Sequence, residues 1–477
     1  MAEYLSPGVY IEELPMGTKP IEGVSTSTVG FVGVSGLIEI LPKANTIPSN
    51  AALKDSLKAL RDKLTEANGF ETNNKNVDMI KAVGEISSLV DVVEETVENI
   101  TNETEKKTAQ DDFLIVQKIY EDAKEVVLYF KYLDKPTFIS SWGDYVSKYG
   151  RYTKDNYLAP AIYSFFANGG KRCYVISTKS NSTSDIVGTV DANNNSTGLQ
   201  AFEEVDEINI LCIPGIEDDT VHQAMITHCE TMGDRFCIFD SKKGESLDAI
   251  QTRKDGLVSD KGIGALYYPW IKIAVEQKNT EGKVVFENML IPPSGAMAGI
   301  YARSDTERGV HKAPANEVVR GALELERTIT KADQDILNPK NINCIRAFPG
   351  RGIRVWGVRT IAPRGSEWKY INVRRLFLFI EESIDKSTQW AVFEPNNEGL
   401  WVKIVQSISS FLFGIWKSGA LVGASPKEAF FVKCDRSTMT QDDIDNGRLI
   451  VIIGLAPIKP AEFVILRIAQ STADSNS

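Results

Sequence analysis

Histidine and cysteine are scarce in this sequence, which has three and six of them among 477 residues. His222 and His228 are six residues apart on a predicted helix, whereas helical metal ligands are usually three or four apart. We therefore expect these two histidines, with Cys229 and Cys237, to be core residues rather than metal ligands. Apolar runs such as INILCIPG and RFCIFD surround several cysteines, which predicts buried thiols and no disulfide framework. The cysteines are Cys173, Cys212, Cys229, Cys237, Cys344 and Cys434.

Long uncharged apolar runs are also lacking, so no segment has the pattern of a membrane span. The opening residues, MAEYLSPG, lack the basic start and the apolar core of a signal peptide. We therefore expect synthesis in the cytoplasm and no direct membrane insertion. Hydrophobic residues are 43% and charged residues 25% of the chain, as in globular proteins, and its length favours two or three domains.

No catalytic constellation is visible. Asp240 ends a predicted strand in CIFDS, where α/β enzymes often place chemistry, but no nucleophile–base partner accompanies it. A helix cap or a turn is the simpler role for it. The segment ANGGKR lacks the first glycine and the Lys-Ser/Thr pair of a phosphate loop, so we interpret Gly169 and Gly170 as a helix C-cap. The cluster PGRGIRVWG is only a weak nucleotide signal, and we expect no enzyme activity, cofactor or metal.

Charge is unevenly distributed along the chain, whose net charge is −11. Residues 49–135 contain 12 Lys/Arg and 18 Asp/Glu, and residues 341–433 contain 13 and 7. An acidic total argues against a general nucleic-acid binder. The basic region, at about +6, requires its own explanation.

Three stretches with different periodicity follow one another. After a predicted core strand at 28–36, residues 49–135 contain no proline, and Leu53, Leu57, Leu60 and Leu64 have helical spacing, which predicts a three-helix insertion. From Pro136 onward strands and helices alternate, which indicates a partly parallel α/β sheet. The last third mixes strands with two long helices.

Each end of the chain carries a predicted strand with no local partner. SPGVYIEEL is followed by a proline- and glycine-rich linker, and Glu462–Gln470 lies beyond Pro457 and Pro460. A single short strand is unstable in water, so both arms are expected to pair elsewhere. The linker of about 13 residues, Pro15–Ser27, could span at most about 45 Å.

The predicted helix GLWVKIVQSISSFLFGIWKSG has two distinct faces. Its apolar stripe contains Trp401, Ile404, Ile408, Phe411 and Ile415, while Lys403, Ser410 and Lys417 lie on the other side at intervals of seven. An ordinary solvated helix face and a basic ridge for an acidic partner fit this pattern equally well. The positive charge of the region favours the ridge.

These segments resemble the tail sheath proteins of contractile phage tails, R-type bacteriocins and extracellular contractile injection systems. The N-terminal YLSPGVYIEELP is similar to the opening arm of that family. VRTIAPRGSEWKYINVRRLFLFIEESIDKSTQWAVFEPNNEGLW, GALVGASPKEAFFVKCD and DIDNGRLIVIIGLAPIKPAEFVILRIAQ resemble its C-terminal domain, and FFANGGKRCYVI resembles its α/β domain. The resemblance covers the first 40 residues, about 136–215 and about 295–470. The helical insertion departs from it.

The resemblance implies a structural subunit that polymerises helically around an inner tube. Such a sheath is held extended in a metastable state and contracts to drive the tube through a target envelope. Expected partners are further copies of the chain, the inner tube protein, baseplate and terminator or cap proteins, and sheath paralogues, without nucleic acid. The expected location is a phage tail or a phage-tail-like particle.

The resemblance and the residue patterns together predict an α/β and α+β multidomain chain whose mixed C-terminal domain is completed by strand exchange. The expected parts are an exchange arm and linker (1–27), an α/β domain (28–40 and 134–340), a helical insertion on the outer surface (41–133), a tube-facing assembly domain (341–458) and a second arm (459–477). Strand exchange is assigned to Val9, Tyr10, Ile11, Glu12, Phe463, Val464, Ile465 and Leu466, and tube contact to Lys403 and Lys417.

Two other interpretations remain at this point. An α/β nucleotide-dependent enzyme with a coiled insert would require a bound cofactor and a catalytic cluster. An inner tube or baseplate protein fits less well, because tube proteins are usually much shorter and all-β.

Overall fold

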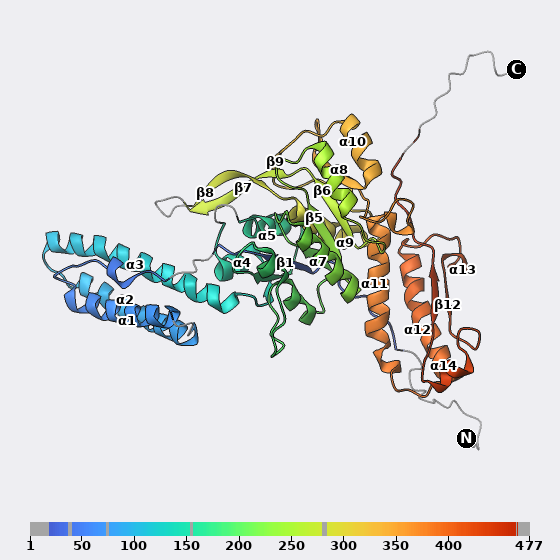
Figure 1. The fold of residues 1–477 in the computed structure, drawn as a ribbon, viewed down its shortest axis with the longest axis horizontal. Coiled ribbons are helices and arrows are strands. Elements are labelled where there is room, and N and C mark those ends of the chain that lie inside the picture. Colours follow the sequence, from blue (N-terminus) through green and yellow to red (C-terminus); the bar gives the residue numbers. More distant parts are fainter. Residues whose placement is uncertain are drawn as a thin grey trace, which may run out of the picture. The chain divides into compact units, whose positions relative to one another are not determined.

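The computed structural model describes residues 19–36, 41–72, 76–152, 156–278, 284–463 and 465. The chain divides into two compact units. The central unit comprises Ser27–Arg303 and Pro314–Pro363, and the C-terminal unit comprises Ser304–Ala313 and Arg364–Ser477 with the N-terminal segment up to Thr26. Figure 1 colours the chain by residue number and labels its elements.

The central unit is built on an eight-stranded sheet with the order β11-β10-β6-β5-β4-β1-β3-β2. The ladders from β10 through β6, β5, β4 and β1 to β3 are parallel, and the two edge strands, β2 and β11, pair antiparallel. Strands of the parallel part are apolar and buried, as in β1, because helices cover the sheet. The strands are β1 (Val29–Gly33), β2 (Thr137–Ile139), β3 (Cys173–Ser177), β4 (Ile210–Cys212), β5 (Phe236–Asp240), β6 (Gly264–Tyr268), β10 (Ile342–Phe348) and β11 (Gly352–Trp356).

Helices connect and cover these strands, which confirms the predicted mixed α/β fold. Their ends carry local signals: Asp218 accepts a hydrogen bond from the Thr220 N–H at the start of α7, and Gly233 ends that helix in the left-handed region. Helices α5 and α9 cross closely, since a Cβ on Gly295 or Gly299 would collide with the α5 backbone. The helices are α4 (Trp142–Tyr149), α5 (Leu158–Ala167), α6 (Thr183–Val187), α7 (Asp219–Met232), α8 (Leu247–Gly256), α9 (Ser294–Arg308) and α10 (Lys331–Leu337), with short 3-10 turns at Gly198–Glu204 and Asn338–Lys340.

A second, three-stranded sheet has the order β8-β7-β9 and is antiparallel throughout. Its strands are β7 (Ile271–Lys278), β8 (Val284–Ile291) and β9 (Ala322–Leu325). This sheet was not predicted as a separate element: β7 and β8 are consecutive in the chain, but the third strand, β9, comes only after α9.

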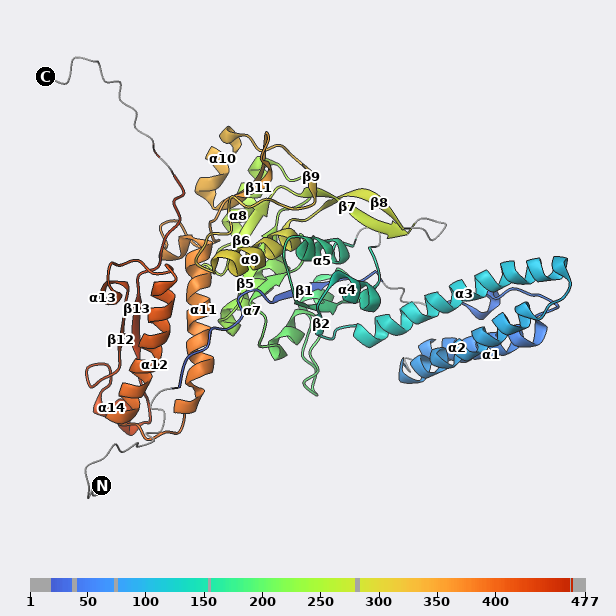
Figure 2. The ribbon, with the colours of Figure 1, turned by 180° about the vertical axis from the view of Figure 1, so that it is seen from behind.

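The predicted helical insertion is a three-helix unit with its own core. It consists of α1 (Lys54–Thr72), α2 (Asn76–Glu98) and α3 (Glu103–Tyr132), preceded by a 3-10 turn at Ala44–Thr46. The helices lie side by side in both Figure 1 and Figure 2. Leu53, Leu57, Leu60 and Leu64 are at most 2% exposed and belong to one apolar cluster with residues of α2 and α3. The leucine spacing therefore predicted the buried face correctly.

The C-terminal unit packs two long helices, α11 (Ile371–Thr388) and α12 (Glu398–Lys417), against a short antiparallel ladder. The ladder is formed by β12 (Phe430–Lys433) and β13 (Ile452–Leu455). Remaining elements are α13 (Pro426–Ala429), α14 (Gln441–Asp445) and the 3-10 turns Glu367–Lys369 and Gln389–Ala391. Both predicted long helices are present, with the predicted stripe of α12 in the core.

The unit boundary differs from the expected one at residue 341. The strands β10 and β11 belong to the central sheet, because β10 pairs in parallel with β6. The change of unit therefore comes after Pro363, and the segment Ser304–Ala313 also belongs to the C-terminal unit. Sequence patterns could not indicate this, since β10 continues the strand–helix alternation without a break.

Candidate assembly interface

The ladder of β12 and β13 has two open edges among the described residues, since no third strand joins it there. The Ala456 N–H donates to the Ala429 carbonyl, so the alternation of an antiparallel ladder directs the backbone groups of Val432 and Ile453 outward. A two-stranded ladder is marginal alone, and this one packs on α12 through half-buried Val432 and Ile453. Its outer face includes Phe431 and Ile452, which are 55% and 45% exposed. Among the described residues, both outer edges of the ladder therefore lack a neighbouring strand.

The predicted exchange residues lie at the limit of what the structure describes. Val9, Tyr10, Ile11 and Glu12 lie outside the described residues, as do Val464 and Leu466. Phe463 and Ile465 are 70% and 79% exposed.

The chain leading to the C-terminal arm is held at Glu462. The Tyr370 hydroxyl donates to the Glu462 carboxylate at 3.1 Å, and the Lys369 ammonium lies 3.5 Å from it. The exposed apolar side chains of Phe463 and Ile465 therefore come within three residues of an anchored position.

One ridge of α11 binds the N-terminal linker, which the sequence suggested was a free tether. The ridge consists of Arg375, Phe379, Ser383 and Ser387, four residues apart and therefore on one helix face. The Ser387 hydroxyl accepts from the Glu22 N–H and the Ser383 hydroxyl from the Val24 N–H, each at 3.2 Å. Gly23 lies against the Phe379 ring, where a Cβ would come within 3.0 Å of it.

The linker is also fixed at both of its described ends. On α12, the Ser407 hydroxyl donates to the Lys19 carbonyl at 2.9 Å. The Arg375 guanidinium donates to the Thr26 carbonyl at 2.7 Å. Residues 19–26 therefore run antiparallel to α11. The four-residue spacing on α11 is a signal that sequence reasoning could have found.

A buried ion pair lies at the end of this ridge. Arg375 donates to both carboxylate oxygens of Asp305 at 2.9 and 2.6 Å, and the Thr26 hydroxyl donates to the same carboxylate at 2.7 Å. The Arg375 and Asp305 side chains are 4% and 5% exposed. A fork-shaped pair at this depth joins three segments that are far apart in the sequence.

The exposed face of α12 carries both predicted lysines. Lys403 and Lys417 are exposed, and the Lys417 ammonium lies 5.7 Å from the centre of the exposed Phe413 ring. Gln406 and Ser410 are exposed between them. The two lysines therefore share one solvent face, while Trp401, Ile404 and Ile408 are buried on the other.

The positive charge predicted for residues 341–433 does not belong to the C-terminal unit as a whole. Arg346, Arg351 and Arg354 contribute to the charge of residues 341–433, but they lie in the central unit, on the hairpin of β10 and β11. Residues 364–477 contain 13 Lys/Arg and 13 Asp/Glu. The ridge is thus a local feature of one helix face and not the charge of its unit.

Among the described residues, α12 is also the one helix whose length and apolarity would suffice for a membrane span. Its apolar stripe is part of the core of the C-terminal unit, with Ile404, Ile408 and Leu412 at most 4% exposed.

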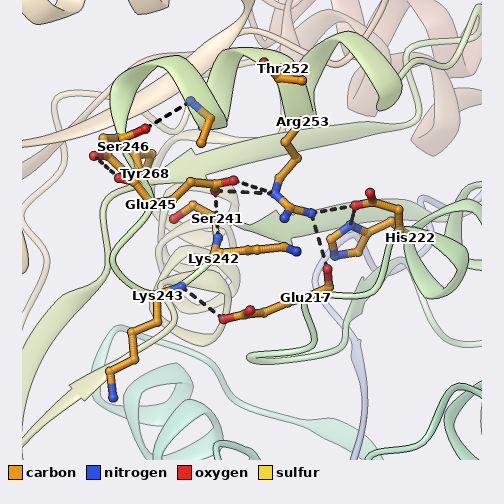
Figure 3. Close-up of polar contacts among 12 residues, drawn as sticks. Glu217, His222, Ser241, Lys242, Lys243, Glu245, Ser246, Thr252, Arg253 and Tyr268 are labelled. Carbon is orange, nitrogen blue, oxygen red and sulfur yellow. Dashed lines mark hydrogen bonds and ion pairs between the residues drawn. The ribbon is translucent and has the colours of Figure 1, made fainter.

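A polar cluster at the carboxyl ends of the central strands tests the enzyme interpretation (Figure 3). Arg253 from α8 bonds the Glu245 carboxylate through Nε at 3.0 Å and Asp219 through Nη1 at 2.6 Å. Glu245 in turn accepts from the Lys242 N–H, and Glu217 accepts from the Lys243 N–H. The carboxylates are therefore used to hold the loop between β5 and α8. Sequence reasoning missed this network, because its members come from separate loops.

The predicted histidines and cysteines have separate buried partners. Burial and the charge of Arg253 lower the pKa of His222 to about 4, and its Nε2 lies 3.1 Å from the Ile216 carbonyl. Burial and Arg235 likewise lower the pKa of His228 to about 4. The thiols of Cys229 and Cys237 lie 3.1 Å apart. The described residues contain no group of three potential ligands arranged for a metal, and all six cysteines are free and buried.

Asp240 is the last residue of β5, and it caps the start of a helix that is distant in the sequence. Its carboxylate accepts from the Ser294 N–H and hydroxyl, each at 2.7 Å, at the start of α9. Burial raises its pKa to about 7. The neighbouring pocket, lined by residues such as Gly33, Tyr157 and Gly215, has a volume of about 150 Å³, below the 300–1,000 Å³ usual for ligand pockets. No nucleophile–base pair faces it among the described side chains.

Two domains of one known protein family match this chain. The phage tail sheath protein central domain matches residues 187–361, and the phage tail sheath C-terminal domain matches residues 364–471. The chain belongs to the phage tail sheath family. The predicted resemblance is thereby confirmed, and it extends over residues 216–294, which the sequence patterns had not covered.

Curated relatives are tail sheath proteins of phages. That of Escherichia phage P2 is 22% identical over 358 residues, covering 70% of this chain and 85% of the relative. That of Vibrio phage KVP40 is 26% identical over 192 residues, which is 40% of this chain. The chain spans only 28%, 38% and 35% of the Vibrio phage KVP40, Burkholderia phage BcepMu and Salmonella phage ViI proteins, respectively.

Solved structures are similar over nearly the whole chain. The sheath complex of the extracellular contractile injection system PVC, in its contracted state, has a TM-score of 0.64 at 26% identity, with 99% of both chains covered. The helical sheath of the anti-feeding prophage, also contracted, has a TM-score of 0.63 at 27% identity, with 98% of this chain and 99% of that chain covered. Neither match supports the enzyme interpretation.

Proposed function

We propose that this chain is the structural subunit of a contractile sheath. It polymerises helically around an inner tube, is held extended behind a kinetic barrier and contracts to drive the tube through a target envelope. The observation that carries the proposal is the likeness to contracted sheath subunits over 99% of the chain, the insertion included. Negative-stain microscopy of the purified protein tests it: filaments or rings are expected, and small globules alone would refute it.

Assembly proceeds by strand exchange. The arm with Val9, Tyr10 and Ile11 docks on the open ladder of a neighbouring subunit, beside a strand from Glu462–Ile468 of another. Support comes from the open edges of β12 and β13 and from the exposed apolar side chains after Glu462. About five main-chain bonds at roughly 0.5–1.5 kcal/mol each contribute several kcal/mol. An arm docked on a neighbour is a heterologous contact, which builds open helices.

Lys403 and Lys417 contact an acidic inner tube. Support comes from their shared exposed face on α12. Exposed ion pairs are individually worth roughly 0–1 kcal/mol, but identical pairs repeat along a sheath. Weak repeated contacts hold the extended state and still release during contraction.

The helical insertion lies on the outer surface and is dispensable for contraction. Support comes from its separate core and from its acidic charge, which would oppose an acidic tube at short range. The remaining partners are the baseplate, terminator or cap proteins and sheath paralogues. The chain has no enzymatic role and belongs to a phage tail or a phage-tail-like particle.

A further inference from the structure

Three arginines and two aromatic rings form a cluster on the hairpin of β10 and β11. This arginine–aromatic cluster consists of Arg346, Phe348, Arg351, Arg354 and Trp356. The rings of Phe348 and Trp356 are 4.5 Å apart. Arg346 and Arg351 lie over Phe348 at 5.1 and 5.4 Å, and Arg351 lies 5.7 Å from Trp356. Stacking on the rings holds guanidinium groups in fixed planes at a partly exposed surface.

The charges of this cluster are not neutralised by any ion pair with a described residue. Arg346 donates to the Gln334 side chain and the Ile329 carbonyl. Arg351 donates to the Asn316 side chain, and Arg354 donates to the Asn316 and Arg351 carbonyls. These neutral acceptors position the guanidiniums without cancelling their charge. The surface is therefore suited to an anionic partner, and bidentate carboxylates match it best.

The same chain carries a surface of opposite charge at one end of its insertion. The acidic end of the insertion, residues 91–105, has six carboxylates and no lysine or arginine. All six are exposed, and none forms an ion pair in the described part of the chain. The six are Asp91, Glu94, Glu95, Glu98, Glu103 and Glu105. The last turn of α2 carries no basic residue of its own, and the Lys106 ammonium of α3 donates to the Glu98 carbonyl at 2.9 Å there.

We propose that the arginine–aromatic cluster of one copy binds the acidic end of the insertion of a second copy. Charge complementarity selects this occupant, since the three arginines and the six carboxylates are opposite in charge and form no ion pair among the described residues. The proposal rests on the proposed function, because a homopolymer presents both surfaces in equal numbers at every subunit. The contact supplements strand exchange, so removing it weakens the polymer and leaves contraction possible.

Charge reversal on each side, and on both together, tests this contact. The full chain is prepared as R351E/R354E, as E94K/E95K and as the combination of all four changes. The critical concentration for polymerisation is measured by sedimentation at low and at near-physiological salt. Each reversal should raise it about five- to tenfold at low salt, the range expected for two or three exposed ion pairs. The combined variant should return to within about threefold of the wild-type value.

A matched control reverses two exposed lysines elsewhere on the central unit, in K171E/K179E. It makes the same charge change as the arginine variant and should leave the critical concentration unchanged. Circular dichroism checks that every variant is folded. If R351E/R354E lost assembly and E94K/E95K did not, the partner would not be the insertion, and the proposal would be overturned. Failure of the combined variant to recover would overturn it as well. A critical concentration unchanged by either reversal would refute this contact and leave the proposed function standing. A wild-type chain that never polymerises would refute the proposed function itself.

Discussion

Replacement of Arg375 by methionine should destabilise the C-terminal unit strongly. The side chain is 4% exposed and donates to both oxygens of Asp305, which is 5% exposed. Methionine fills similar space but leaves the Asp305 carboxylate buried without its counter-charge, with the Thr26 hydroxyl still donating to it. Breaking one side of a buried pair costs about 3–5 kcal/mol. The Thr26 carbonyl also loses its donor, at about 1 kcal/mol.

A double variant that removes both charges shows how much of the destabilisation comes from leaving Asp305 charged and unpaired. The double variant Asp305→Asn with Arg375→Met has no uncompensated charge, so it should be more stable than Arg375→Met by about 2 kcal/mol or more. Urea unfolding of the unpolymerised chain, followed by the fluorescence of the tryptophans, measures both. Hydrogen exchange at Val24 should accelerate in the single variant, because the linker loses its anchor. A cost below about 1 kcal/mol for Arg375→Met, or a double variant less stable than the single one, would refute this reasoning.

Four further predictions concern assembly and pH. Deletion of residues 1–14 should leave a folded chain that does not polymerise, and normal filaments in the microscope would disprove strand exchange. Reversal of Lys403 and Lys417 to glutamate should impair assembly on the tube in co-sedimentation, and a solved sheath with both side chains on its outer surface would contradict the tube contact. Replacement of 45–133 by a short Gly/Ser loop should permit polymerisation and contraction; a folded chain that cannot assemble would make the insertion an architectural element. Because burial raises the pKa of Asp240 to about 7, stability present below the unfolded pKa of about 4 is lost as pH rises towards 7, by about 1.4 kcal/mol per unit, and D240N should abolish that part of the pH dependence in urea unfolding.

Sequence reasoning reached furthest where one period persists over many residues. The leucines of α1 and the stripe of α12 predicted their buried faces, because helical spacing alone decides which side chains point inward. The buried cysteines followed similarly from apolar strands. Family resemblance supplied the function, which no cluster of side chains would have indicated.

What the sequence did not reveal depends on contacts between distant segments. The polar network around Arg253 joins loops that share no motif. The change of unit after Pro363 depends on β10 pairing with β6, and a strand carries no mark of the sheet it will join. The linker along α11 has turn-forming residues typical of a tether, yet its backbone groups find donors and acceptors on a helix. The composition of a segment indicates its own conformational preference, but not the hydrogen-bond partners that another segment supplies.

The docked linker limits how far two subunits joined by strand exchange can move apart. With residues 19–26 held along α11 and α12, these eight residues no longer add to the reach of the proposed tether, which leaves at most the four residues before Lys19 to do so. Four extended residues span at most about 14 Å, against about 45 Å for the whole segment. A joint this short transmits the displacement of one subunit to its neighbour almost at once. Contraction would then travel through the sheath as a wave from ring to ring, with each subunit pulled by the one that moved before it.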